Sequence, residues 1–164
     1  MDLMDKSSPE YAITMLMSRP NLPRNIKLQP EAKECIRFAD KMRGHVSYGR
    51  YNGVWVHLPN ESKRGIIMNL LLLAMGMIRG AADYLFLWRG GNCAIELKTP
   101  ERHGWRRGKW AKIKKTAQSE YQGYFQKWCE FCGVPYYVCY TAEEAEKILI
   151  NLGALTLSNP VTGR

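Results

Sequence analysis

The sequence predicts an α/β fold in which helices flank both faces of a mixed β-sheet. Segments with apolar residues at helical spacing alternate along the chain with short segments rich in β-branched and aromatic residues. A glycine pair at residues 90–91 separates two short apolar strands, which is typical of a β-hairpin. A helix and then another strand follow this hairpin, and that order favours a parallel pairing through a right-handed crossover.

Length and charge narrow the class of protein. A chain of 164 residues fits one domain, and its 46% hydrophobic and 11% aromatic content is typical of a globular protein. The net charge of +9 indicates a polyanionic partner, either nucleic acid or an acidic membrane. The longest apolar run, residues 65–78, is too short to span a bilayer and contains Asn69 and Gly76. The N-terminus lacks the pattern of a signal peptide, so we expect a nucleic-acid partner and no membrane.

The cysteines predict a reducing environment. There are 5 of them, an odd number without a disulfide framework, so we expect an intracellular, cytoplasmic protein, in the host cytoplasm if the chain is viral. Cys129 and Cys132 form a CxxC pair on a helical stripe with Phe125 and Trp128. Because no second pair or suitably spaced histidine accompanies them, we expect buried apolar side chains and not a zinc or redox site.

The N-terminal part begins with residues 1–28, a loosely structured segment that holds several prolines and one helix over 11–17. Pro30 then opens a helix as a first-turn proline. Its inward stripe is Cys35, Phe38 and Met42, and we expect it to end before Gly44.

The remaining elements follow from turn residues and periodicity, within a domain that spans residues 29–153. The predicted elements are a strand at 54–58, a helix at 63–75 ended by Gly76, the hairpin, a basic stretch at 101–115, a helix at 116–131 ending at Gly133, a strand at 135–140, a helix at 142–152 ended by Gly153, and a tail at 154–164 without a clear pattern.

The hairpin carries the main functional signal. A turn centred on the glycine pair places Leu85 opposite Glu96 and Asp83 opposite Lys98, with these four side chains on one face. The expected opposite face consists of Tyr84, Phe86, Ala94 and Ile95 or their neighbours. Two carboxylates this close stay ionised most readily around a cation, and oxygen ligands suit Mg²⁺ or Mn²⁺.

With the lysine beside them, these carboxylates outline a phosphodiester-cleaving site. The simpler interpretation is that Asp83 caps a strand while Glu96 and Lys98 are solvated on an exposed sheet face.

Several separated segments, in order, resemble the virus-type replication-repair nuclease (VRR-NUC) domain. This family is a branch of the restriction-endonuclease-like superfamily with the PD-(D/E)XK signature, and the resemblance covers about residues 30–149. The matching segments are the Pro-Asn segment with basic residues at 57–64, the glycine-bracketed approach to the aspartate at 74–83, the E-x-K strand at 95–98, the Ser-x-x-Gln helix start at 119–122 and the final strand at 133–140. Ala82 departs from the family by replacing the usual proline.

The resemblance implies a restriction-endonuclease-like core of the αβββαβ type. It also implies a Mg²⁺- or Mn²⁺-dependent deoxyribonuclease, an endonuclease more than an exonuclease, that cuts branched or structured DNA in the manner of a Holliday-junction resolvase and pairs as a homodimer. The alternatives are a non-catalytic nucleic-acid-binding or assembly protein with a degenerate nuclease fold, and a regulatory subunit of a larger complex. The presence of Asp83, Glu96 and Lys98 disfavours the degenerate fold.

Specific roles follow from the same resemblance. Asp83, Glu96 and the backbone carbonyl of Leu97 would bind the divalent ion, Lys98 would position the nucleophile or stabilise the transition state, and Gln122 would orient water or phosphate.

A glutamate on the first helix would complete the metal site, and both Glu31 and Glu34 are candidates. Glu31 is preferred because it lies four residues before Cys35 on the inward face. The three histidines do not form a ligand set, which disfavours zinc.

The basic stretch at 101–115 is either a solvated insertion or a clamp on nucleic acid, in which cations neutralise phosphates and indoles stack on bases. The expected nucleic-acid-binding residues are Arg102, Trp105, Arg106, Arg107, Lys109, Trp110, Lys112, Lys114 and Lys115, together with Asn60, Lys63 and Arg64.

Overall fold

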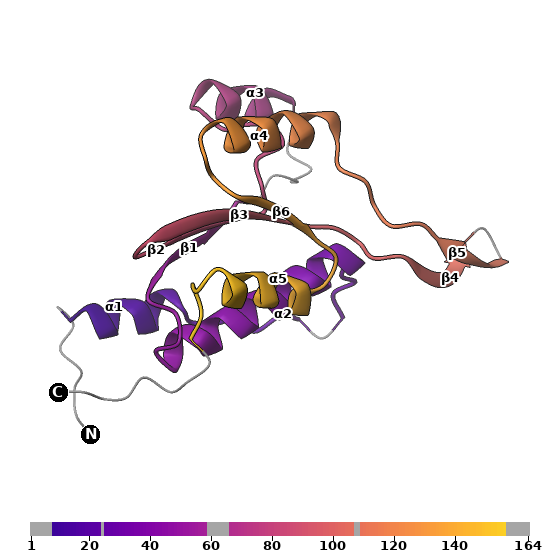
Figure 1. The fold of residues 1–164 in the computed structure, drawn as a ribbon. Coiled ribbons are helices and arrows are strands. Elements are labelled where there is room, and N and C mark those ends of the chain that lie inside the picture. The colour runs from indigo at the N-terminus through magenta and orange to yellow at the C-terminus, as the bar shows by residue number, and fades with distance from the viewer. Residues whose placement is uncertain (1–7, 24, 59–65, 107–108, 157–164) are drawn as a thin grey trace.

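The computed structural model describes residues 8–23, 25–58, 66–106 and 109–156 (Figure 1). The helices are α1 (Pro9–Leu16), α2 (Pro30–Ser47), α3 (Ile66–Ala74), α4 (Glu120–Phe131) and α5 (Ala142–Asn151). The strands are β1 (Gly53–His57), β2 (Tyr84–Trp88), β3 (Gly91–Leu97), β4 (Arg102–Arg106), β5 (Lys109–Ile113) and β6 (Tyr136–Cys139).

The main sheet has the strand order β1-β2-β3-β6 and is mixed. β1 and β3 each pair antiparallel with β2, whereas β6 pairs in parallel with β3 after the α4 crossover. Helices α2 and α5 lie on one side of the sheet, and α3 and α4 lie on the other (Figure 1). The predicted mixed α/β class, the flanking helices and the parallel pairing are therefore confirmed.

The larger core lies between the sheet and the α2–α5 layer. Phe38 and Met42 of α2 are fully buried, as the predicted stripe requires, and pack with Tyr84, Phe86 and Ile95 of the sheet. The rings of Phe38 and Tyr84 meet edge to face at 5.1 Å. Each such side chain contributes about 1.5–3 kcal/mol by leaving water, so this layer supplies most of the hydrophobic stabilisation.

The opposite face of the sheet has a smaller core. Ala82, Ala94 and Cys129 are buried there, with Leu85 packed against them. Of the residues named for the Tyr84 face, Ile95 pairs with Tyr84, whereas Ala94 lies on the opposite face because it pairs with Leu85 and cross-strand partners share a face.

The hairpin register also differs from the prediction. Trp88 pairs with Gly91 and Leu85 with Ala94, so the turn is formed by residues 89–90, and Gly90 has a φ of 98°. Gly91 lies in the strand, and a side chain is excluded there because a Cβ would come within 2.6 Å of the Trp88 ring. This register places Asp83 opposite Glu96. The shift is by a whole side-chain period, so both carboxylates keep the face that the sequence predicted.

Two helix boundaries differ from the predicted ones, and local backbone features explain both differences. α2 runs through Gly44 to Ser47, because the positive φ of 64° that ends the helix belongs to Gly49. α4 begins at Glu120, and not at 116, because Ser119 and Gln122 form a capping box.

The remaining differences lie at the ends and in the basic stretch. Residues 102–106 and 109–113 form a two-stranded hairpin, β4–β5, that extends away from the main sheet (Figure 1). The tail contributes to the core, since Ala154 and Leu155 are buried and Leu155 bridges to Tyr51.

Within the described residues, no helix has both the length and the apolar character needed to cross a membrane. Cys129 is buried as predicted, but Cys132 is exposed because α4 ends just before it.

Candidate active site

The candidate site forms where β2 begins and β3 ends. The Asp83 side chain reaches across the hairpin, and its Oδ2 accepts a hydrogen bond of 2.7 Å from the Leu97 N–H. This contact follows from the observed register, in which Asp83 lies opposite Glu96. One carboxylate is thereby held at the strand end next to the other.

Glu96 and Lys98 form a buried ion pair. Their side chains are 0% and 4% exposed, and Lys98 Nζ lies 2.6 Å from Glu96 Oε1. The interpretation of these residues as solvated on an open sheet face is therefore wrong. Charged groups are almost never buried to this extent without a specific partner or function.

Gln122 contacts the same carboxylate oxygen from α4. Its Nε2 donates a hydrogen bond to Glu96 Oε1, and its own Oε1 accepts a hydrogen bond of 2.8 Å from the Ser119 N–H. Because the second bond belongs to the capping box of α4, the start of the helix fixes which end of the amide faces Glu96.

Gly80 sets the distance between α4 and the strand that carries Asp83. It has a φ of 72°, and a Cβ at this position would lie 2.3 Å from the backbone of Tyr121 and 2.5 Å from the Gln122 nitrogen. Arg79 lies over the Tyr121 ring at 5.6 Å. The loop before Asp83 therefore packs directly on the first turn of α4, which brings Gln122 to Glu96.

The electrostatics of the cluster centre on Glu96. Burial and the charges of Asp83 and Glu31 outweigh the opposing hydrogen bond and charge of Lys98, and together they raise the pKa of Glu96 to about 7. Burial alone would lower the pKa of Lys98, but its contact with Glu96 raises it above the usual value. Concentrated negative charge around a buried carboxylate favours binding of a cation.

One oxygen of the buried carboxylate lacks a partner. Glu96 Oε2 is inaccessible to solvent and forms no hydrogen bond within the described part of the chain. Buried polar atoms of native proteins nearly always have partners, and a bound ion is one explanation for an exception. The unpaired oxygen therefore fits a divalent cation.

The two helix glutamates occupy different surroundings. The charge of Glu31 acts on Glu96 and Lys98. Glu34 instead accepts hydrogen bonds from Arg37, at 2.9 Å, and from the Ala142 N–H at the start of α5, at 3.0 Å. Glu34 thus serves the packing of α2 on α5, and Glu31 is the glutamate next to the cluster.

A divalent ion would have few protein ligands here. Among residues 8–23, 25–58, 66–106 and 109–156, no three Asp, Glu, His or Cys side chains form a ready metal-binding group. Mg²⁺ commonly binds through one or two carboxylates and keeps several waters. The residues that would hold it are Asp83 and Glu96, with the Leu97 carbonyl and, from α2, Glu31.

The basic stretch continues directly from this site. Arg102, Lys112, Lys114 and Lys115 are exposed, and Lys112 pairs with Glu101 at 2.8 Å. The Trp110 side chain is 64% exposed. The remaining predicted nucleic-acid contacts lie outside the described side chains: Asn60, Lys63, Arg64, Trp105, Arg106, Arg107 and Lys109.

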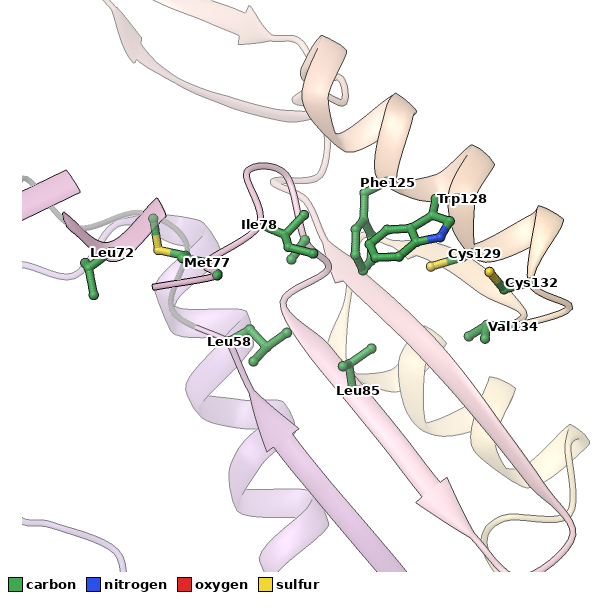
Figure 2. A pocket seen from close by; sticks show the side chains of 12 residues that line it. Leu58, Leu72, Met77, Ile78, Leu85, Phe125, Trp128, Cys129, Cys132 and Val134 are labelled. Atoms are coloured by element: carbon green, nitrogen blue, oxygen red, sulfur yellow. The ribbon is translucent and has the colours of Figure 1, made fainter. Parts of the chain in front are cut away.

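An apolar pocket that the sequence analysis did not predict lies on the α3–α4 side of the sheet (Figure 2). Its volume is about 620 Å³, and its lining includes Leu58, Met77, Leu85, Phe125 and Trp128. None of the candidate catalytic residues lines it. The run Ile-Ile-Met-Asn-Leu-Leu-Leu-Leu in α3, which lacks a polar face, is the sequence signal for this surface.

Comparison of the chain with protein-family models, curated proteins and solved structures found no match. The functional assignment therefore depends on the geometry of the site and the chemistry of its residues.

Proposed function

We propose that this protein is a metal-dependent nuclease that hydrolyses phosphodiester bonds of DNA, with a VRR-NUC-like active site on a restriction-endonuclease-like core. The observation that carries the proposal is the environment of the buried Glu96, which lies beside Asp83. One oxygen of its carboxylate contacts Lys98 and Gln122, and the other has no hydrogen-bond partner among the described residues. A structural ion pair would not need a second carboxylate beside it.

The chain's own residues would divide the work as follows. Asp83 and Glu96 hold the cation, and Gln122 fixes the orientation of the Glu96 carboxylate. Lys98 keeps its charge because Glu96 raises its pKa, and its ammonium offsets negative charge that develops at the phosphate. Bound Mg²⁺ or Mn²⁺ supplies Lewis-acid activation of water and charge neutralisation.

The distribution of basic residues supports a nucleic-acid substrate. The β4–β5 hairpin follows β3, the strand that carries Glu96, in the sequence. It has exposed side chains at Arg102, Lys112 and Trp110. Together with the net charge of +9, the cations and the indole on the segment that follows β3 support a polyanionic substrate. Branched or structured DNA is the substrate we propose, and a non-catalytic DNA-binding protein is the alternative.

We also propose that a second copy of the chain covers the apolar surface of α3 and α4. Ile67 is 84% exposed and Phe131 is 89% exposed, although an apolar helix such as α3 is ordinarily buried. The residues outside the described part of the chain, 1–7, 24, 59–65, 107–108 and 157–164, include few large apolar side chains, namely Met1, Leu3, Met4, Leu157 and Val161. In a dimer with twofold symmetry, the exposed apolar side chains of α3 in each copy would lie against the apolar pocket of the other copy.

Light scattering tests the pairing. An Ile67→Glu change should convert a dimer to a monomer, whereas Ile13→Glu, at an exposed apolar position on α1, should leave the mass unchanged. A wild-type chain that is monomeric at micromolar concentration would contradict the homodimer without affecting the nuclease proposal.

The nuclease proposal is tested by cleavage of labelled junction, flap, single-stranded and duplex DNA with Mg²⁺ or Mn²⁺. Wild type should cleave at least one substrate, and the Asp83→Asn and Glu96→Gln variants should not, with circular dichroism to confirm folding. Glu130→Gln changes an exposed carboxylate on α4 and serves as the matched control. DNA binding without cleavage would favour the non-catalytic alternative.

A further inference from the structure

A second cleft, lined by lysines, lies beside the candidate active site. Its volume is about 620 Å³, and it opens at the carboxyl ends of β3 and β6, where ligands commonly bind in open α/β sheets. Its lining includes Lys112, Lys114, Lys115, Thr116, Gln118 and Tyr140. We call it the lysine cleft.

The lysine cleft lies next to β3, the strand that carries Glu96. Val138, which lines it, is the register partner of Glu96. The Lys98 N–H donates to the Cys139 carbonyl at 2.8 Å, and the Thr116 N–H donates to the Thr99 carbonyl at 3.0 Å. A polymer strand lying in the cleft would therefore run alongside β6, next to the strand that carries Glu96.

The charge of the cleft indicates an anionic occupant. Lys114 and Lys115 are exposed, and neither forms an ion pair with any residue that the structure describes. Glu101 is the acidic residue of the lining, and Lys112 neutralises it at 2.8 Å. Two cations thus remain available for phosphates.

The cleft also offers an aromatic ring. Tyr140 is half-buried in the lining, and the Lys115 ammonium lies 5.1 Å from its ring centroid. Aromatic rings beside cations are typical of grooves that bind single-stranded nucleic acid, in which bases stack on the ring while lysines neutralise the backbone. Bases in a duplex are already stacked and paired, so they cannot reach such a ring.

We propose that the lysine cleft binds a single-stranded stretch of the substrate, with phosphates at Lys114 and Lys115 and an unpaired base on Tyr140. The inference rests on the proposed nuclease function and specifies its substrate as DNA with a single-stranded segment beside the cut. The cleft volume is within the ~300–1,000 Å³ typical of ligand pockets, which suits nucleotide units and not the width of a duplex.

Binding, measured separately from cleavage, tests this. We would use fluorescence anisotropy of the full chain in EDTA, with labelled oligothymidylate of about ten nucleotides and a blunt duplex of the same length. Tyr140→Leu should weaken single-strand binding by roughly 5- to 100-fold and change duplex binding less than twofold. Tyr140→Phe keeps the ring and should bind like wild type, which guards against a folding defect. Tyr124→Leu, at an exposed tyrosine on α4 outside the cleft, is the matched control.

The lysines have their own readout. The Lys114→Ser/Lys115→Ser variant should reduce the log–log salt slope for single strands by about 1.4, since each phosphate contact contributes about 0.7. The exposed pair Lys127→Ser/Lys147→Ser should not change this slope. Equal losses on both DNAs for Tyr140→Leu, or an unchanged slope for the cleft lysines, would overturn the proposal.

Failure of the cleft and failure of the nuclease are distinguishable. A chain that cleaves DNA with Mg²⁺ but binds single strands independently of Tyr140 and the cleft lysines refutes the cleft alone. A chain that shows the predicted binding losses but never cleaves refutes the nuclease and leaves the cleft as a nucleic-acid site.

Discussion

Binding of a divalent ion should compete with a proton on Glu96. Burial and the neighbouring charges together raise the pKa of Glu96 to about 7 in the metal-free protein, and a carboxylate must be ionised to bind the ion. The apparent affinity for Mg²⁺ should therefore fall about tenfold for each pH unit below that value. Between about pH 8 and about pH 5 the loss is roughly a hundredfold, or about 2.7 kcal/mol at 1.36 kcal/mol per unit.

Isothermal titration with Mn²⁺ and then Mg²⁺ at several pH values measures this dependence, and buffers of different ionisation enthalpy report the proton that is released. The Glu96→Gln variant should bind the ion more weakly, with no proton release in this range. The reasoning fails if wild type binds equally well across these pH values, or if Glu96→Gln retains the pH dependence.

The raised pKa of Glu96 also makes the stability of the metal-free protein depend on pH. Folding raises the pKa of Glu96, so the contribution of this group is most favourable when it is protonated and is lost as pH rises from about 4.5 to about 7. The rise in the pKa of Glu96 from 4.5 to about 7 corresponds to about 3 kcal/mol. Urea unfolding in EDTA should show wild type losing stability relative to Glu96→Gln over this range. His57, whose pKa burial lowers, is present in both proteins and cancels in the difference.

Three further predictions concern single positions. Lys98→Ala should lower the cleavage rate by roughly a hundredfold or more without weakening Mn²⁺ binding in calorimetry; a loss confined to DNA affinity would make Lys98 a docking residue. Glu31→Gln should raise the Mg²⁺ concentration needed for half-maximal cleavage, whereas Glu34→Gln should lower the melting temperature, and the reverse pattern would show that α2 presents the other glutamate to the site. Gly80→Ala should destabilise the fold by about 1–3 kcal/mol in urea unfolding, because the new Cβ meets the α4 backbone. The control is Gly123→Ala on α4 itself, where nothing lies within 4 Å of the new Cβ, and this change should be neutral or stabilising.

The face of the hairpin was predictable because alternation is a local property of any strand. Asp83 and Glu96 stayed together even though the register was wrong, since the error was a full side-chain period. The register depends on the Trp88 ring lying where a Cβ of residue 91 would be. That packing joins both strands across the turn, and the composition of the turn does not encode it.

Other features were missed because they depend on distant contacts. From the sequence, Gly80 indicates only a loop. In the structure, its lack of a side chain leaves room for the α4 backbone at residues 121–122. The β4–β5 hairpin was missed because its strands pair with each other in a separate two-stranded sheet. Without burial on one face, the alternation that identifies strands from sequence is absent.

The unequal cores on the two faces of the sheet have a consequence for how this protein responds to heat. Large aromatic and aliphatic side chains join the sheet to α2 and α5, whereas the fully buried sheet-side residues beneath α4 are the small Ala82 and Ala94, with larger side chains only partly buried around them. Regions with fewer buried contacts open at lower free energy than the whole molecule. Amides of α4 should therefore exchange with deuterium before those of α2, and activity that depends on Gln122 should decline on warming while most of the fold is still intact.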